Sequence, residues 1–413
     1  MNAVIPRVHL FCCRTHSRYV CLICIVLLFF LANRYIYLSY HKYSMASTMI
    51  SMAAAYRIDD TRPIGAFAKI TFSGYKTAQA MKKLMESLVT AKVEGVCYWT
   101  AELICSGHYA ELWDTIFLFY GKYIHVANPK LAIYLENKLS NFKENMNNAA
   151  SAQAQLDFRN DPAFRCMFCE ITIMLCLSDK KFTIQYAGVP DEDFDLVVLK
   201  NNLVAPDFAR AESIIQPEDP RELLVTVNEL QFCLSREVSS TMRANYWVEW
   251  LLDYAKLCKK KKQPCLIQRR THDIVDAKHQ RNIVWLIWDA IQREVGERRS
   301  TVLTKVMGAL FRMFALRYTE IHNTRRKCLL YFAVALLTIC PQGSVEKTPM
   351  VRDKARIDCA VAQIDAIFAQ VRGDESETDA EPSALVRTVT TSADKMRAIS
   401  LFEKTQQANR HPT

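Results

Sequence analysis

Glycine is scarce in this sequence, with ten residues in 413, against a usual share of about 7 per cent. Glycine supplies the positive-φ turns and close backbone approaches on which phosphate-cradling loops depend. The chain contains no Gly-x-x-x-x-Gly-Lys-Ser/Thr loop, no dinucleotide fingerprint, no Gly-x-Ser-x-Gly elbow and no His-Glu-x-x-His pair. We therefore expect an all-α protein that is not an enzyme and holds no cofactor. An enzyme with a site that these motifs do not describe is the alternative.

Signs of a secreted protein are also missing. No Asn-x-Ser/Thr acceptor for glycosylation occurs in the chain. The 15 cysteines are odd in number, and most of those after residue 50 fall at apolar positions of helical patterns. This distribution favours reduced thiols packed in a core and a cytosol-like compartment.

Long hydrophobic runs are limited to the first 40 residues. Residues 19–32 are uncharged, and the run extends to residue 40 if Arg34 snorkels toward the membrane surface. A span needs roughly 20 apolar residues, so residues 19–40 are a candidate signal anchor or signal peptide. The alternative is a gene-calling artefact, because Met45, Met49 and Met52 offer later starts. A genuine segment would make the protein a single-pass membrane protein with its body in the cytosol.

Apolar residues recur with a helical period from about residue 74 onward. The pattern predicts helices at 76–92, 93–106 and 109–124, with Gly107 closing the second one. Three Asn-Pro or Asp-Pro steps, Asn128-Pro129, Asp161-Pro162 and Asp219-Pro220, predict N-caps with proline at the first helical position. Later helices are expected at 220–236, 239–258, 279–295, 300–319, 324–340 and 351–371.

Polar stretches divide the chain into four parts. We expect a leader at 1–72, an N-terminal helical domain at 73–146, a C-terminal helical domain at 157–371 and a disordered acidic tail at 372–413. The helices would pack as hairpins in one or two bundle-like domains. The apolar run at 328–340 has 13 residues, too few for a span, and is expected to be the central helix of the second core.

Two short segments resemble each other. "VCYWTAELI" at 96–104 and "ANYWVEWLL" at 244–252 share a Tyr-Trp pair, a glutamate and a hydrophobic end. Two copies of one helical hairpin would explain this similarity, and so would coincidence.

Cysteine and histidine spacing offers few metal ligands. Cys166 and Cys169 form a Cys-x-x-Cys pair with Cys176 nearby, and the other pair on offer is Cys258 with Cys265. The first three lie among Phe, Met, Ile and Leu, so packed thiols are the favoured interpretation and no metal site is assigned.

Two histidines are also considered as candidate functional residues. We expect His125 to bond the last carbonyls of a helix and His108 to face solvent.

Positive charge is concentrated in one stretch of a chain whose net charge is +10. We call residues 256–281 the basic segment; nine cations there face two aspartates, Asp273 and Asp276. Such a density suits phosphate contacts, which gain affinity by releasing counterions. The expected nucleic-acid-binding residues are Lys256, Lys259, Lys260, Lys261, Lys262, Arg269, Arg270, Lys278 and Arg281. The alternative is a solvated lysine-rich turn. Tryptophans 247, 250, 285 and 288 have helical spacing and are expected in the core rather than as base-stacking platforms.

Several long segments together resemble a known group of viral proteins. "CYWTAELICSGHYAELWDTIFLFYGKYIHVANPKLAIYLENKL", "YWVEWLLDYAKLCKKKKQPCLIQRR", "NIVWLIWDAI" and "RRKCLLYFAVALLT" resemble a conserved but uncharacterised core-gene family of the nucleocytoplasmic large DNA viruses. The resemblance covers residues 70–371, and its members begin near the equivalent of Ser73. It implies a viral context and brings no catalytic residues.

A second resemblance concerns residues 81–135 alone. A helix with Tyr98-Trp99, a Ser-Gly turn, a long helix and "IHVANP" are similar to the helical collar of clamp-loader-type ATPases. The resemblance implies an assembly or docking unit, whose protein-contact aromatics would be Trp113, Tyr120 and Tyr123.

These observations favour a helical adaptor or scaffold of a large DNA virus. It would act in genome replication, transcription or packaging, with other viral proteins and DNA or RNA as partners, as an oligomer or a monomer, in the host cytoplasm or virus factory. The alternative is a structural virion protein associated with the capsid or with a membrane through residues 19–40.

Overall fold

The structure is a computed structural model that describes residues 58, 60–181, 184, 188–341, 343–351 and 353–373. The described residues form helices and one isolated bridge between Ile70 and Lys76, with no strand among them. This confirms the all-α prediction. The expected membrane segment at 19–40 and the tail beyond 373 lie outside the described residues. Within them, no helix combines the length and the apolar character that crossing a bilayer requires.

The first half of the described chain contains η1 (Ile64–Phe67), α2 (Thr77–Val89), α3 (Val93–Cys105), α4 (Tyr109–Phe119), η2 (Tyr120–Ile124), η3 (His125–Ala127), α5 (Leu131–Asn148), α6 (Ala152–Asp157), η4 (Phe158–Asn160) and α7 (Pro162–Leu177). The second half contains η5 (Asp191–Phe194), α8 (Leu196–Leu199), η6 (Lys200–Asn202), α9 (Ala209–Glu212), α10 (Leu223–Leu234), α11 (Thr241–Lys260), η7 (Ala277–His279), α12 (Val284–Arg298), α13 (Thr301–Ala315), α14 (His322–Arg325), α15 (Lys327–Thr338), α16 (Ser344–Lys347), α17 (Lys354–Ala362) and α18 (Ile364–Gly373).

Helix α3 is the centre of the N-terminal helices. It packs against α2, α4, α7 and α18, and every residue from Gly95 to Cys105 is buried. A helix that is apolar all round must be covered on all sides. The helical pattern predicts one buried face on α2, formed by Ala80, Leu84, Leu88 and Ala91; the first three are buried, whereas Ala91, just beyond α2, is exposed.

Helix α15 is the centre of the following helices. It contacts α10, α11, α12, α13 and α14, and also α4, η2 and η3 of the N-terminal part. Its residues Leu329 to Leu337 are all buried. This confirms that residues 328–340 contain a buried central helix, while its assignment to a separate second core stays a prediction.

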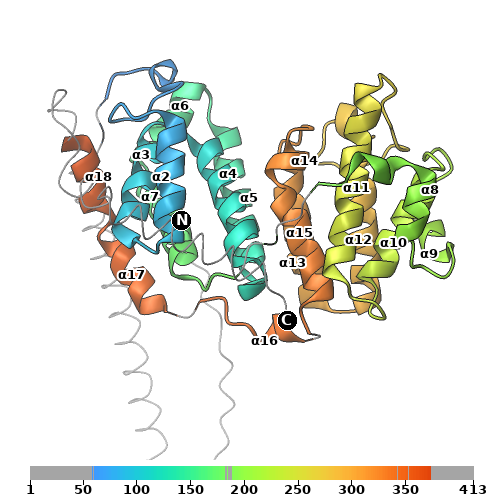
Figure 1. Ribbon diagram of the computed structural model, residues 1–413. Helices are drawn as coiled ribbons and strands as arrows, with labels where there is room; N and C mark the ends of the chain where they lie inside the picture. The colour runs from blue at the N-terminus through green and yellow to red at the C-terminus, as the bar shows by residue number, and fades with distance from the viewer. Residues whose placement is uncertain are drawn as a thin grey trace, which may run out of the picture. The chain divides into compact units, whose positions relative to one another are not determined.

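The last two helices return to the first ones. Helix α17 packs on α7, and α18 packs on α3 and α7; Figure 1 shows α18 in orange-red near the blue α3. The residues that α18 buries are Ile364, Phe368 and Val371, at a helical spacing of four and three. The described residues form one compact unit with one hydrophobic core. The expected division into domains at 73–146 and 157–371 stays a prediction.

Two of the four expected caps are confirmed. Gly107 has a φ of +72°, and the N–H groups of Gly107 and His108 donate to Ile104 at 3.0 Å and Leu103 at 2.9 Å, which is a Schellman motif. The Asp161 side chain accepts from the Ala163 N–H at 2.8 Å and precedes Pro162.

The other two expected caps are wrong. Helix α5 begins at Leu131, after a turn, and the Asn128 side chain donates instead to the backbone oxygen of Met350 at 2.9 Å. Asp219 precedes α10 by four residues and is bound to Arg270. In both cases the side chain that was expected to cap a helix interacts instead with a residue distant in the sequence.

One of the two histidine predictions is wrong, and the bonding expected of His125 stays a prediction. The prediction that His108 faces solvent is wrong, because His108 is buried and its Nε2 lies 3.0 Å from the Ile70 oxygen and 3.1 Å from Thr77 Oγ1. His125 is buried at the end of the π-helical turn η2, with its ring 6.1 Å from that of Phe332.

The two similar segments occupy comparable places. Each Tyr-Trp pair lies on the second helix of a closely packed pair, α2 with α3 and α10 with α11. The Tyr98 and Trp99 rings are 5.1 Å apart, and those of Tyr246 and Trp247 are 4.8 Å apart. That they are copies of one unit stays a prediction.

Candidate nucleic-acid interface

The basic segment begins at the C-terminal end of α11. Lys262 has a φ of +62°, and the N–H groups of Lys262 and Gln263 donate to Lys259 at 3.0 Å and Cys258 at 2.9 Å. This is a Schellman motif with lysine where glycine is usual. Cations at a helix C-terminus are stabilised by the helix dipole, so the lysines here are favourably placed.

Three lysines of this turn carry unneutralised charge. We call Lys260, Lys261 and Lys262 the lysine turn; all three are exposed. In the described part of the chain none of their side chains has a hydrogen bond or ion pair. Their neighbours are engaged, since Lys256 Nζ lies 2.7 Å from Asp253 and Lys259 Nζ lies 2.6 Å from Glu320. Exposed pairs of this kind stabilise a fold by less than about 1 kcal/mol, so a phosphate can compete for both lysines.

The remaining exposed cations of the segment are Arg269, Lys278 and Arg281, and Lys278 Nζ lies 3.9 Å from Asp276. The two arginines lie on stretches that pair through their backbones. The N–H of Ile267 donates to Arg281, and that of Arg270 donates to Gln280. Arg269 Nε donates to the Gln280 side chain at 2.6 Å, and Arg281 Nε donates to the Ile267 oxygen at 3.1 Å. These bonds orient both exposed guanidinium groups and leave their other N–H groups for a ligand.

Arg270 does not belong to the exposed set. It is 5% exposed and donates to Asp219 at 2.7 Å and to Asp289 at 2.7 Å. Burial works against the charge, but the hydrogen bonds of Asp219 and Asp289 outweigh it and raise the pKa of Arg270. Because a buried cation with two carboxylate partners holds the fold together and cannot reach a phosphate, Arg270 is removed from the candidate interface.

The aromatic side chains near the segment serve packing. Trp247, Trp250, Trp285 and Trp288 are all buried, as expected, so they offer no surface for stacked bases. Apolar side chains do reach the surface at Leu266, Ile274 and Ile321, which are 48%, 42% and 51% exposed. The first two lie within the basic segment, and Ile321 is next to the Glu320 that pairs with Lys259.

The three expected protein-contact aromatics lie in or against the core. Trp113 packs against Phe168 with ring centroids 5.4 Å apart. Tyr120 is fully buried, and its hydroxyl donates to the oxygens of Asn128 and Pro129 at 3.0 Å. Tyr123 is half-buried. The contacts of Trp113 and Tyr120 are thus with the chain's own helices.

Of the 11 described cysteines, five are buried, five are half-buried and Cys359 is exposed. Cys169 and Cys176 are buried in α7, and burial raises the pKa of Cys176 to about 11. Burial, with the thiol of Cys258 adjacent, raises the pKa of Cys265 to about 12. Among the described residues, no three His, Cys, Asp or Glu side chains are grouped as a metal would need.

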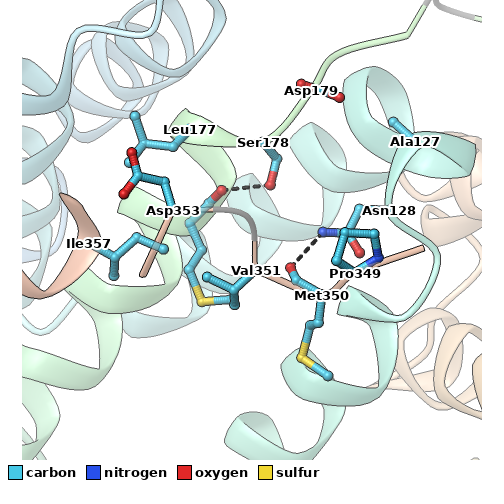
Figure 2. A pocket seen from close by; sticks show the side chains of 11 residues that line it. Ala127, Asn128, Leu177, Ser178, Asp179, Pro349, Met350, Val351, Asp353 and Ile357 are labelled. Atoms are coloured by element: carbon cyan, nitrogen blue, oxygen red, sulfur yellow. Dashed lines mark hydrogen bonds between the residues drawn. The ribbon is translucent and has the colours of Figure 1, made fainter. Parts of the chain in front are cut away.

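A small pocket lies where residues 349–351 and 353 pass between the turn at Ala127 and Asn128 and the C-terminal end of α7. Figure 2 shows Asn128 bonded to Met350 on one side and Asp353 and Ile357 on the other. Its volume of about 50 Å³ has room for a water molecule or two, whereas ligand sites usually enclose about 300–1,000 Å³. It is a packing gap beneath the returning C-terminal segment.

Comparisons with known proteins give no match. No protein-family model, no curated protein and no solved structure is similar to this chain.

The exposed apolar side chains beside these cations were missed by the sequence reasoning. Leu266, Ile274 and Ile321 reach the surface there, and Ile321 adjoins the segment through the pair of Glu320 with Lys259. Only the fold brings Ile321 to the basic segment, so no local pattern could have identified it.

Proposed function

We propose that the protein is a non-enzymatic helical adaptor or scaffold of a large DNA virus, which contacts nucleic acid through the basic segment. The viral context comes from the sequence resemblance over residues 70–371. Other viral proteins would be its partners, in the host cytoplasm or virus factory, during genome replication, transcription or packaging.

The observation that carries the nucleic-acid contact is the lysine turn. Three consecutive exposed lysines without counter-charges sit at a helix end, flanked by Lys256, Lys259, Arg269 and Arg281. Each phosphate that such cations neutralise releases condensed counterions and contributes a salt-dependent free energy of binding. Contacts of this kind carry no sequence information, so the expected binding is of moderate affinity and independent of sequence.

The test measures binding by the full chain across a range of salt concentrations. Fluorescence anisotropy of a labelled DNA strand, its duplex and an RNA strand would be titrated at several KCl concentrations. The triple substitution K260Q/K261Q/K262Q removes three charges without uncovering a carboxylate. We expect the slope of log K against log [salt] to fall by roughly two to three and affinity to fall by about tenfold or more at 0.1 M salt.

A matched control separates position from net charge. Lys69, Lys82 and Lys305 are exposed lysines outside the basic segment, and their side chains have no partner in the described residues. The substitution K69Q/K82Q/K305Q also removes three charges, and we expect it to keep the wild-type slope. Equal losses in both triple variants would mean that binding is diffuse, and no wild-type binding would exclude the proposed contact.

One observation favours the second candidate, a membrane-associated or capsid-associated structural virion protein. The exposed apolar side chains Leu266, Ile274 and Ile321 adjoin the basic cations, and such a combination suits an anionic lipid surface. This candidate would be favoured if the wild-type protein co-sedimented with phosphatidylserine vesicles but did not bind DNA, and if the L266S/I274S variant no longer co-sedimented.

A further inference from the structure

The segment between α7 and α10 carries negative charge on a basic protein. Residues 190–213 contain six acidic and two basic side chains. We call residues 191–212 the acidic edge, and Figure 1 shows its helices α8 and α9 on the far side of α10 and α11 from α15. Five carboxylates of the acidic edge are exposed and have no ion pair within the described residues: Asp191, Glu192, Asp195, Asp207 and Glu212.

Hydrogen bonds fix the acidic edge on α10 and α11. The hydroxyl of Tyr246 on α11 donates to Asp193 at 2.9 Å and accepts from Asn202 Nδ2 at 3.0 Å, which brings η5 and η6 together. The carboxylate of Glu229 on α10 accepts the Val204 N–H at 3.0 Å. The acidic edge is therefore preformed, so little conformational entropy is lost when a partner docks on it.

Apolar side chains project from the acidic edge beside its carboxylates. Val197 is 79% exposed, and its N–H donates to Asp195 Oδ1 at 2.8 Å. Phe208 is 53% exposed and follows Asp207 directly, and Val204 is also exposed. Exposed apolar groups that are rimmed by polar ones are typical of protein–protein interaction sites. The acidic edge therefore combines apolar and acidic groups suited to docking.

The basic segment offers the complementary combination. Its lysine turn has three charges without counter-charges, and Leu266 and Ile274 are exposed within the segment. In the described part of the chain no ion pair joins the basic segment to the acidic edge. Both surfaces are therefore left for a second molecule, and complementary potentials would orient the two molecules as they meet.

We propose that the acidic edge of one molecule docks onto the basic segment of a second copy of this chain. The two surfaces differ, so the contact is head-to-tail, and a pair leaves one acidic edge and one basic segment free for further copies. This self-association goes beyond the proposed function and does not rest on it. Nucleic acid bound at the lysine turn would compete with the second copy.

Sedimentation velocity of the full chain tests the contact. At micromolar concentrations in about 50 mM KCl, the wild type should form complexes that grow with protein concentration. They should dissociate in about 500 mM KCl, where charges are screened within a few ångströms. The edge variant D191N/E192Q/E212Q and the turn variant K260Q/K261Q/K262Q should each weaken self-association about tenfold or more at low salt.

An equimolar mixture of the two variants should restore association, but only to a complex of two chains. The turn variant keeps its acidic edge and the edge variant keeps its basic segment, so one native contact forms and no further copy can add. A mixture that stays monomeric would overturn the proposal, because it would mean that the two surfaces do not bind each other.

A matched control separates the position of the carboxylates from their number. Glu94, Glu144 and Asp157 are exposed, lie outside the acidic edge and have no ion pair in the described ranges. The substitution E94Q/E144Q/D157N removes three negative charges, as the edge variant does, and should leave self-association unchanged. An equal loss in this control would mean that net charge, rather than the acidic edge, drives association.

The apolar part of the contact is tested without any change of charge. V197S/F208S should weaken self-association about tenfold at low salt, because both side chains become buried in the contact. M242S replaces an exposed methionine outside both surfaces and should have no effect. Unchanged association of V197S/F208S would exclude docking through this face of the acidic edge.

The outcomes separate this contact from the proposed function. A wild type that binds nucleic acid but stays monomeric at every concentration excludes the second copy and leaves the proposed function standing. A wild type that self-associates as described but binds no nucleic acid gives the reverse result. A monomeric wild type that binds poly-L-lysine, with binding lost in the edge variant, would assign the acidic edge to a different basic chain and overturn the proposal.

Discussion

At the scale of single residues, Lys262 departs from the rule for helix ends. A residue with a β-carbon in the left-handed region is disfavoured relative to glycine by roughly 1 kcal/mol. Lys262 nevertheless occupies that conformation in a Schellman motif. The use proposed for the Lys262 side chain in this conformation is phosphate contact.

The substitution K262G should separate stability from binding. Glycine adopts the left-handed conformation freely, so we expect the free energy of unfolding to rise by about 0.5–1 kcal/mol. Loss of the charge should at the same time lower the salt slope of nucleic-acid binding by about one. Urea denaturation and anisotropy titration measure the two effects.

Ala91 provides the control for this substitution. It ends α2 in the same motif, with a φ of +56° and the Lys92 N–H donating to Ser87 at 3.0 Å. A91G should stabilise the protein by a similar amount and leave nucleic-acid binding unchanged. If K262G proved less stable than the wild type, the lysine side chain would be contributing to the fold itself.

The sequence predicted the burial of the tryptophans correctly, but it did not predict which charged side chains pair with each other. The tryptophans of α11 and α12 were correctly assigned to the core because their spacing follows one helix. Arg270 was wrongly counted with its exposed neighbours, because its burial depends on Asp219 and Asp289, which lie on other elements. Nothing in a charge run distinguishes a solvated cation from one that has two distant carboxylates.

At the scale of elements, the sequence predicted where helices lie and that Gly107 ends α3. It did not predict that α4 ends at Phe119 and is followed by a turn. The chain was expected to continue as one helix to Ile124. It instead ends α4 at Phe119 and forms the π-helical turn η2, which packs on α15. Such turns insert a residue to fit a neighbour, and that neighbour is about 200 residues away in the sequence.

Gly121 is the residue that allows this contact. A β-carbon at Gly121 would lie 2.9 Å from Cδ2 of Leu329 and 3.0 Å from Sγ of Cys328. Both atoms belong to packed side chains of the central helix, so G121A would force η2 and α15 apart. We expect the free energy of unfolding to fall by about 1–3 kcal/mol, as measured by urea denaturation.

The control for the contact is Gly65. It lies in η1 with no atom within 4 Å of an added β-carbon and without a positive φ. G65A should change the free energy of unfolding by less than about 0.5 kcal/mol. Equal effects of the two substitutions would show that the packing of η2 against α15 is looser than the distances indicate.

At the scale of the whole molecule, the packing of the C-terminal helices on the N-terminal ones depends on contacts that no local sequence pattern predicts. The amphipathic pattern of α18 predicts that Ile364, Phe368 and Val371 are buried, but it does not identify α3 as the partner. The guanidinium of Arg165, itself fully buried, lies 5.1 Å from the Phe368 ring centre. The C-terminal helices thereby complete the packing of the first ones.

A buried polar network joins three helices of the second half. Arg298 on α12 donates to the oxygens of Leu234 at 2.9 Å and Leu337 at 3.0 Å, where α10 and α15 end. Its Nε lies 2.7 Å from Glu294, whose other oxygen accepts from Gln231 at 3.4 Å. Burial raises the pKa of Glu294 to about 6, although the charge of Arg298 works in the opposite direction.

This shift predicts a pH dependence of stability. The unfolded carboxyl titrates near pH 4.5, so between about pH 4.5 and 6 the native state binds more protons than the unfolded one. The contribution of Glu294 to the free energy of unfolding is therefore fully present below pH 4.5 and is lost as pH rises through 6.

The variant E294Q keeps hydrogen-bonding groups but does not titrate. The free energy of unfolding of the wild type relative to E294Q should therefore fall by about 1–2 kcal/mol between pH 4.5 and 6.5. Urea denaturation of both proteins at half-unit pH steps measures this difference, and a difference that stayed flat or rose with pH would mean that Arg298 keeps the carboxylate charged throughout.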